Sequence, residues 1–228
     1  MADEVRPEVG SFLDRLDEQH SAGLLALGTR RRFPAGSTVF MVGEPALEVL
    51  VVLSGEAKAV VPASDGREVI VGVRGPGDVL GEIAALDGGT RSATVVAIGE
   101  LVVLMIGLQP FDAFLERHPS ALRHLVLVIA GRLRASNRRQ LEFGTGDSLG
   151  RLCARLVELS ERYGEVDDDG TVRLVSPLTQ TDLGALSGMS REAVVKSMRA
   201  LRSLGWVRND GRTIELLDPA AVRRRADH

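Results

Sequence analysis

Two ionisable residues stand out in the stretch GEIAALDGGTRSATV, residues 81–95. Glu82 and Arg91 lie nine residues apart in an otherwise largely apolar segment, with Gly88 and Gly89 between them. A guanidinium can hold two oxygens of an anion with its planar fork, and a carboxylate accepts hydrogen bonds from hydroxyl groups. The two side chains therefore suit a ligand that carries an anion and a hydroxyl. The alternative is a surface salt bridge between them that binds nothing.

A second set of polar residues follows in LTQTDLGALSGMSREAVVKSMRALRSLGWV, residues 178–207. Thr179 and Asp182 predict a capping box, and Gly188 predicts the left-handed end of that helix. Ser190 can cap the next helix, whose apolar face carries Val194, Met198 and Leu201. The opposite face carries Arg191, Glu192, Val195, Lys196 and Arg199. Two helices joined by a glycine turn, the second presenting long polar side chains, suit the major groove of DNA.

The segments that must position these residues differ along the chain. Residues 29–108 form short β-runs interrupted by glycine, such as LEVLVVLSG and ELVVLMIG, which predict a small β-sandwich or roll. SDG at residues 64–66 is a hairpin signal, and residues 9–28 indicate short amphipathic helices against the roll. GWVRNDGRTIEL, residues 205–216, predicts a second hairpin that would form a wing beside the paired helices.

A long helix is predicted between these parts, because residues 119–143 show helical spacing and contain only one glycine, Gly131. A seam with alternating steps of three and four residues runs along it through Val126, Ile129, Leu133, Ser136, Gln140 and Phe143. This heptad spacing favours a dimer seam, and the alternative is an ordinary core helix packed on the roll. A further helix over residues 148–163 and an acidic turn, GEVDDDGT, precede the last module.

Composition excludes several classes of protein. The chain has 228 residues, 44% of them hydrophobic, and a net charge of −3; acidic side chains predominate in residues 1–118 and basic ones in residues 119–228. Its single cysteine, Cys153, cannot form an internal disulfide or a four-cysteine cluster, and we expect a buried helix thiol. The four histidines are not clustered, so neither haem, a metal nor an enzymatic site is expected. No signal peptide or membrane span is evident, which predicts a cytoplasmic protein.

Taken in order, these motifs resemble the Crp/Fnr family of bacterial transcription regulators, typified by the cyclic AMP receptor protein. Residues 81–95 resemble its phosphate-binding cassette, and SREAVVK resembles the start of its recognition helix. The resemblance implies an α+β chain with an N-terminal cyclic-nucleotide-binding β-roll of the jelly-roll type, a long dimerisation helix and a C-terminal winged helix-turn-helix. We expect the sensor domain at residues 1–118, the dimerisation helix and hinge at 119–146, and the DNA-binding domain at 147–228.

For the ligand, the resemblance implies cyclic AMP as an allosteric effector. Arg91 would bind the phosphate, Glu82 would accept from the ribose 2′-hydroxyl, and Ser92 would add a donor. The backbone of Gly81, Glu82, Ile83 and Ala84 would approach the phosphate at the start of a short helix. Thr90 departs from the family, which usually has proline before the arginine.

The family recognises the base from the long helix, and the matching residues here are Ser136 and Asn137, where the heptad seam turns polar. These side chains can satisfy adenine, but they can also adapt to guanine, so cyclic GMP stays open as the effector. The alternative is that they specify the register of the dimer. A regulator that binds DNA without any ligand is the remaining alternative for the function.

The resemblance also implies double-stranded DNA as a partner. Arg191 suits guanine, Glu192 suits the amine of cytosine, and Lys196 suits a second guanine or a thymine. The other expected DNA contacts, several of them to phosphates, are Thr179, Gln180, Ser190, Arg199 and Arg212. A homodimer would place two recognition helices about 34 Å apart on a roughly palindromic site, with RNA polymerase as a further partner.

Overall fold

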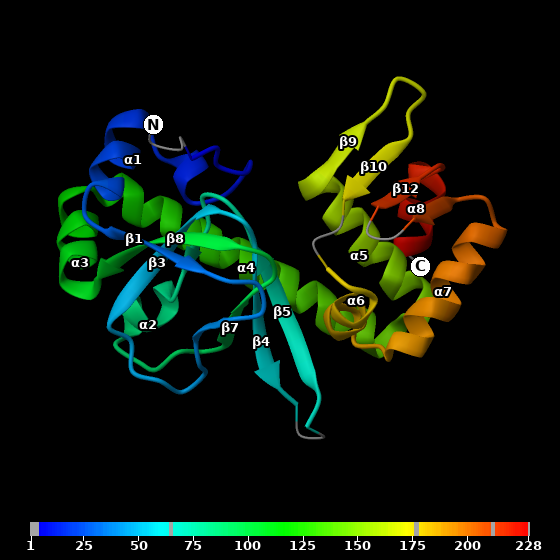
Figure 1. The fold of residues 1–228 in the computed structure, drawn as a ribbon, viewed down its shortest axis with the longest axis horizontal. Helices are drawn as coiled ribbons and strands as arrows, with labels where there is room; N and C mark the ends of the chain where they lie inside the picture. The colour runs from blue at the N-terminus through cyan, green and yellow to red at the C-terminus, as the bar shows by residue number, and fades with distance from the viewer. Residues whose placement is uncertain (1–4, 64–65, 176–177, 211–212, 228) are drawn as a thin grey trace. The chain divides into compact units, whose positions relative to one another are not determined.

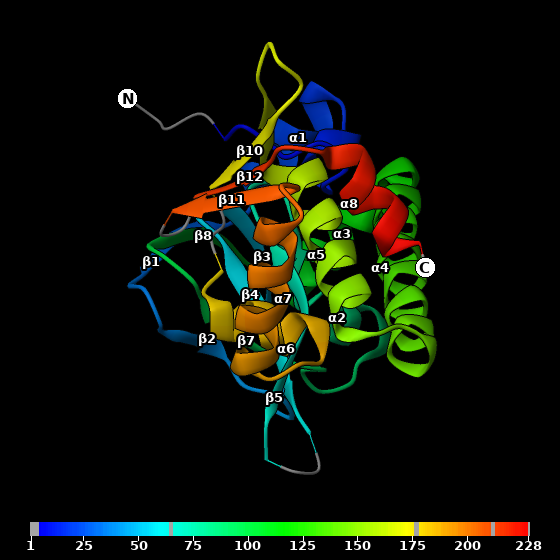
Figure 2. The ribbon, with the colours of Figure 1, turned by 90° about the vertical axis from the view of Figure 1, so that its right-hand side faces the viewer.

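The computed structural model describes residues 5–63, 66–175, 178–210 and 213–227 (Figure 1). The chain divides into two compact units, Met1–Arg134 and Ala135–His228, which are treated separately below. The expected α+β class is confirmed: a β-rich first unit, a long helix and a helical C-terminal unit with its own small sheet (Figure 2). Among the described residues, no helix combines the length and the apolar content that crossing a bilayer requires.

The first unit is built on two antiparallel four-stranded sheets. One has the strand order β1 (Thr29–Phe33), β8 (Leu101–Gly107), β3 (Glu48–Ser54), β6 (Val79–Leu80). The other has the order β2 (Thr38–Phe40), β7 (Thr94–Ala97), β4 (Ala57–Pro62), β5 (Glu68–Arg74). Side chains alternate along β3, so that Leu50 and Val52 join one apolar cluster while Val49 and Val51 join another. The roll predicted from the short glycine-bounded β-runs is therefore present.

Short helices cover the second of these clusters, as expected for residues 9–28. They are η1 (Leu13–Arg15), α1 (Glu18–Leu25), α3 (Leu108–Arg117) and the first part of α4 (Pro119–Thr145). Phe12, Phe111 and Leu125 are fully buried in this cluster. Burying each such side chain contributes roughly 1.5–3 kcal/mol, so this packing holds the start of α4 on the roll.

Helix α4 presents apolar residues on two faces. Leu125 and Val128 are buried against the roll, and Ile129 packs partly against the same cluster. Val126 and Leu133 remain 51% and 61% exposed. The helix is thus a core helix on one face, while the predicted seam is divided: Val126 and Leu133 are exposed, and Ile129 packs partly against the roll.

The described part of the second unit contains a small antiparallel sheet and four helices besides α4. The strand order is β11 (Val207–Asp210), β12 (Thr213–Leu216), β10 (Val172–Val175), β9 (Gly164–Val166). The helices are α5 (Ser148–Tyr163), α6 (Gln180–Ser187), α7 (Arg191–Ser203) and α8 (Pro219–Ala226). The expected acidic turn lies at the end of the β9–β10 hairpin. Helix α8 was not predicted, although Asp218 caps this helix and Pro219 begins it.

A buried arginine and two partly exposed glutamates join the C-terminal part of α4 to α5. Arg155 is 4% exposed and donates to the carboxylates of Glu142 and Glu158 at 2.6–3.0 Å. Burial alone would raise the pKa of Glu158, but the guanidiniums of Arg139 and Arg155 hold it below its ordinary value. Arg139 completes the network with a 2.8 Å ion pair to Glu158.

Cys153 is fully buried within α5, as expected for a structural thiol. Burial raises the pKa of this thiol to about 11. The thiol stays protonated at neutral pH, and a protonated, inaccessible cysteine is a poor nucleophile and a poor redox sensor.

Gly188, the glycine between α6 and α7, allows the packing of this turn against α4 to be tested. Gly188 has φ +62°, and an added Cβ would lie 2.7 Å from Cε1 of Phe143 in α4. Gly205 also has a positive φ, of +71°, but nothing lies within 4 Å of its Cβ position. We predict that Gly205→Ala costs about 1–2 kcal/mol of unfolding free energy from backbone strain, and that Gly188→Ala costs more because it also crowds Phe143. Urea unfolding of both variants measures the difference; equal losses would contradict the Phe143 contact.

Candidate functional site

The backbone of the cassette is shaped by two left-handed glycines. Gly81 (φ 79°) precedes the six-residue helix α2 (Glu82–Asp87), and Gly88 (φ 69°) ends it. A side chain on Gly81 would collide with the guanidinium of Arg91, which packs against this glycine. Glycine is therefore required here both for its conformation and for the close approach of Arg91.

Arg91 is a buried cation, 3% exposed. It donates to the carbonyl of Glu48 at 2.8 Å and to that of Gly81 at 3.4 Å, and its guanidinium lies 4.2 Å from the centre of the Phe40 ring. Its nearest carboxylate oxygen, on Glu48, is 3.7 Å away. Burial lowers the pKa of Arg91, and the charges of Glu48, Glu44 and Glu82 oppose that shift. Nε of Arg91 is buried and has no acceptor among the described residues.

Glu82 is also buried, at 5% exposure, but its partner comes from α4. Arg132 donates to Glu82 Oε1 at 2.6 Å, to the carbonyl of Val79 at 3.0 Å and to Asp78 Oδ1 at 3.3 Å. One guanidinium thus ties the first turn of α2, the strand β6 and the residue before it to the long helix. Asp78 itself is 6% exposed, so two buried carboxylates share one partly buried guanidinium.

The salt-bridge alternative for Glu82 and Arg91 is wrong. Within the described part of the chain the two side chains form no ion pair with each other, and neither lies on the surface. Glu82 is bound to Arg132 of α4, and Arg91 to the carbonyl of Glu48 in β3. The two charges are therefore neutralised independently of each other.

Arg132 was not identified from the sequence, although a signal was present. Leu125, Val128 and Arg132 follow one another at helical spacing, so Arg132 falls on the stripe of α4 that faces the roll. A charge on a core-facing stripe needs a partner, because an unpaired buried charge is costly. The missing information was which carboxylate would meet it.

The remaining cassette residues have different surroundings. Ala84 is buried, Ile83 is 41% exposed, and Ser92 is exposed. The turn before Arg91 is held by hydrogen bonds of the Arg91 main chain to residues 43 and 44 and by a bridge between Pro45 and Thr90. Thr90 stands where the family usually has proline, and these backbone contacts hold the turn with threonine at that position. Ser136 and Asn137 are exposed residues of α4 in the second unit.

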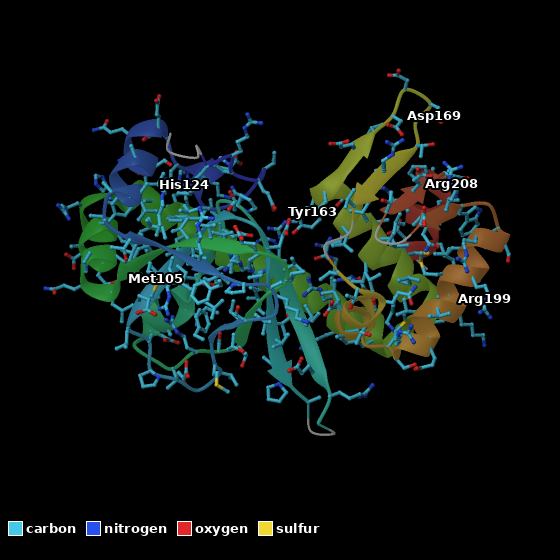
Figure 3. All side chains as sticks on the ribbon, viewed as in Figure 1. Met105, His124, Tyr163, Asp169, Arg199 and Arg208 are labelled. Carbon is cyan, nitrogen blue, oxygen red and sulfur yellow. The ribbon has the colours of Figure 1, made fainter. Side chains whose placement is uncertain are left out.

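The paired helices of the second unit form as predicted. Thr179 and Asp182 make a reciprocal capping box, Gly188 ends α6 in the left-handed conformation, and Ser190 caps α7. The apolar face of α7 is buried at Val194, Met198 and Leu201. The exposed face comprises Arg191, Glu192, Lys196 and Arg199, the last of which projects outward from α7 in Figure 3.

The other expected DNA contacts fall in several places. Gln180 is exposed in the first turn of α6, whereas the hydroxyl of Thr179 is engaged with Asp182 at 2.6 Å. Arg212 lies outside the described residues. Arg202 of α7 donates to Asn209 of β11 at 3.2 Å, which connects α7 to the wing. An added Cβ on Gly184 would lie 2.7 Å from the carbonyl of Met189, so the absence of a side chain there lets α6 and the following turn pack closely.

Comparison with known proteins matches residues 30–118 to the cyclic nucleotide-binding domain and residues 150–225 to the Crp-like helix-turn-helix domain. A CRP-like cAMP-activated global transcriptional regulator of Mycobacterium tuberculosis is 32% identical over 194 residues, 85% of this chain and 86% of that protein. The cyclic AMP receptor protein of Thermus thermophilus is 29% identical over 196 residues, 85% of this chain and 86% of that protein.

Among solved structures, a CRP-family transcriptional regulator from Thermus thermophilus matches with a TM-score of 0.71 at 26% identity, over 87% of this chain and 97% of that one. The two domain matches follow each other along the chain in the order in which the structure places the roll and the paired helices. The chain therefore belongs to the Crp/Fnr family of DNA-binding transcription regulators, with a cyclic nucleotide-binding domain followed by a Crp-like helix-turn-helix.

Proposed function

We propose that this regulator is controlled by cyclic AMP, bound between the cassette of the roll and the dimer helix. The observation that carries the proposal is the pair of buried, separately held charges in the cassette. Among the described residues, Nε of Arg91 is buried without an acceptor, and the guanidinium contacts two carbonyls and the Phe40 ring but has no carboxylate oxygen closer than 3.7 Å. A phosphate would supply the anion that this guanidinium lacks.

Glu82 supports the same ligand, because its carboxylate can accept a hydrogen bond from the ribose hydroxyl of a cyclic nucleotide. A carboxylate can accept several hydrogen bonds, so Glu82 can keep Arg132 at 2.6 Å and still accept from a ribose 2′-hydroxyl. The ligand would then share an acceptor with a residue of α4. A ligand shifts a conformational equilibrium only by its difference in affinity for the two states, and a carboxylate shared with the helix is one source of that difference.

The choice of base rests on Ser136 and Asn137, which we propose contact adenine. Two relatives described above carry cyclic AMP in their names, which favours this nucleotide. Another effector such as cyclic GMP, or DNA binding without a ligand, is the alternative. Calorimetric titration of nucleotide-free protein with cyclic AMP, and in parallel with cyclic GMP, distinguishes all three.

Arg91 provides the sharpest test of ligand binding. Arg91→Leu should weaken cyclic AMP binding about 100-fold or more, because a charge-assisted contact to phosphate is lost. Arg91→Lys keeps the charge but not the fork and should lose about 10-fold. Both variants should retain non-specific DNA binding at fixed salt. Wild-type ligand affinity in Arg91→Leu, with thermal unfolding showing a folded protein, would overturn the assignment.

We also propose that the chain acts as a homodimer through the predicted seam of α4. Leu133→Glu should convert the dimer to a monomer in sedimentation equilibrium, because it places like charges opposite each other in the seam. Leu141 is the matched control, since it is 69% exposed on the same helix but falls outside the heptad positions. A dimer that persists in Leu133→Glu, or dissociates equally in Leu141→Glu, would contradict the seam.

For DNA, we propose that Arg191, Glu192 and Lys196 contact base edges and that Arg199 contacts a phosphate. A preferred site is first selected from random duplexes. Arg191→Gln should then lose about 10- to 100-fold in affinity and relax the preference at one base pair. Arg199→Gln should weaken all duplexes similarly and reduce the salt dependence by about one ion.

Arg224→Gln is the control for the DNA measurements, because this exposed arginine belongs to α8 and not to the paired helices. It should change neither affinity nor preference. If Arg191→Gln and Arg199→Gln behave alike, with no change in sequence preference, the division between base and phosphate contacts is wrong.

A further inference from the structure

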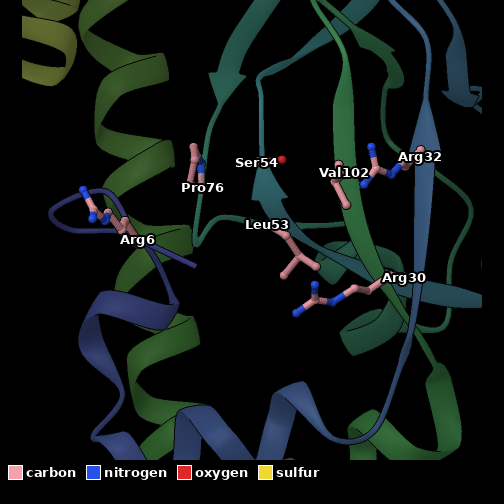
Figure 4. Close-up of a pocket in the computed structure, with 7 residues that line it drawn as sticks. All are labelled: Arg6, Arg30, Arg32, Leu53, Ser54, Pro76 and Val102. Atoms are coloured by element: carbon pink, nitrogen blue, oxygen red, sulfur yellow. The ribbon is translucent and has the colours of Figure 1, made fainter. Parts of the chain in front are cut away.

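The first unit contains a pocket that shares no residue with the cassette (Figure 4). Its volume is about 570 Å³, and it opens beside strands β1, β3 and β8. The residues that line it are Arg6, Arg30, Arg32, Leu53, Ser54, Pro76 and Val102. Three of these seven are arginines and none is acidic, so the pocket has a strongly positive wall.

Strand pairing explains why the arginines gather there. Arg32 pairs with Val102 across β1 and β8, and Val102 pairs with Ser54 across β8 and β3, so the three residues form one row. Arg30 lies two residues before Arg32 and therefore points to the same face of the sheet. Figure 4 shows Arg30 and Arg32 on one side of the opening and Arg6, from the N-terminal segment, on the other.

Little in the described chain neutralises these charges. Neither Arg6 nor Arg30 forms an ion pair with a described residue. Arg32 contacts Glu100 at 3.3 Å, but the two side chains are 72% and 69% exposed, and such surface pairs contribute about 1 kcal/mol or less. All three arginines are exposed, so solvent screens their mutual repulsion, and an anion held between them would gain from all three charges at once.

The walls and the size indicate the kind of anion. Leu53, Pro76 and Val102 offer apolar surface, and Ser54 offers one hydroxyl. An inorganic ion would leave most of a 570 Å³ cavity unfilled, whereas this volume is typical of sites for small organic ligands. Arginine forks suit phosphate and carboxylate groups equally. We propose that this pocket binds a small organic anion with two or more phosphate or carboxylate groups attached to a carbon skeleton.

The experiment is a calorimetric titration of the full chain with fructose 1,6-bisphosphate, citrate and inorganic pyrophosphate, at an ionic strength of about 0.15 M to suppress diffuse attraction. Each titration is repeated with saturating cyclic AMP, which separates this pocket from the cassette. The expected result is saturable binding of at least one organic anion at one site per chain, unchanged by cyclic AMP. No saturable binding of either organic anion up to roughly 10 mM would overturn the proposal.

Variants on the same strand supply the matched control. Arg31 lies between Arg30 and Arg32 but points to the opposite face, where its guanidinium is 5.1 Å from the centre of the Phe33 ring. Arg30→Gln and Arg6→Gln should weaken binding about 10-fold each, and Arg31→Gln should leave it unchanged. Equal loss in Arg31→Gln would mean diffuse attraction to a basic strand. Pyrophosphate binding as tightly as the organic anions would mean an ion site only; either result overturns the proposal.

Discussion

The conformation of the cassette depends on how two buried charges are neutralised. Glu82 and Arg91 are each at most 5% exposed, and an isolated charge at such a position is costly. The fold meets this requirement with partners from different elements: Arg132 of α4 for Glu82, and carbonyls at the start of β3 and at Gly81 for Arg91. The backbone of residues 81–91 is therefore held from both sides, and a side chain at Gly81 is excluded by the guanidinium it adjoins.

Helix α4 makes different contacts at its two ends. Its first part is packed on the roll through Leu125 and Val128 and tied to the cassette by Arg132. Its last part is tied to α5 by the ion pair of Glu142 with Arg155, and Phe143 lies beside the glycine between α6 and α7. Each unit thus holds one end of the same helix by a buried charge and by apolar packing. Under the proposed function, a helix anchored in this way is an element on which both ligand and DNA would act, and coupling between two sites requires such an element.

The paired helices of the second unit and the cassette of the first unit are held in place by different kinds of contact. In the paired helices of the second unit, caps and turns are local: Thr179, Gly188 and Ser190 act within a few residues of their own positions. In the first unit the decisive contacts are distant in sequence, such as Glu82 with Arg132 and Arg91 with Glu48. The pocket lined by Arg6, Arg30 and Arg32 also depends on contacts distant in sequence, since three strands and the N-terminal segment together supply its lining residues.

The sequence by itself determined what depends on neighbours along the chain. Glycine-bounded β-runs, the helical spacing of residues 119–143, the capping box and the apolar face of α7 all follow from local rules, and the structure confirms them. Helix α8 was missed despite a local signal. The tertiary structure alone decided the partners that lie on other elements: Glu82 binds Arg132 and not Arg91, and Arg155 of α5 binds Glu142 of α4. A buried charge needs a partner of opposite charge, and the fold determines which partner lies near enough to pair with it. That choice depends on contacts between residues far apart in sequence, which local patterns do not reveal.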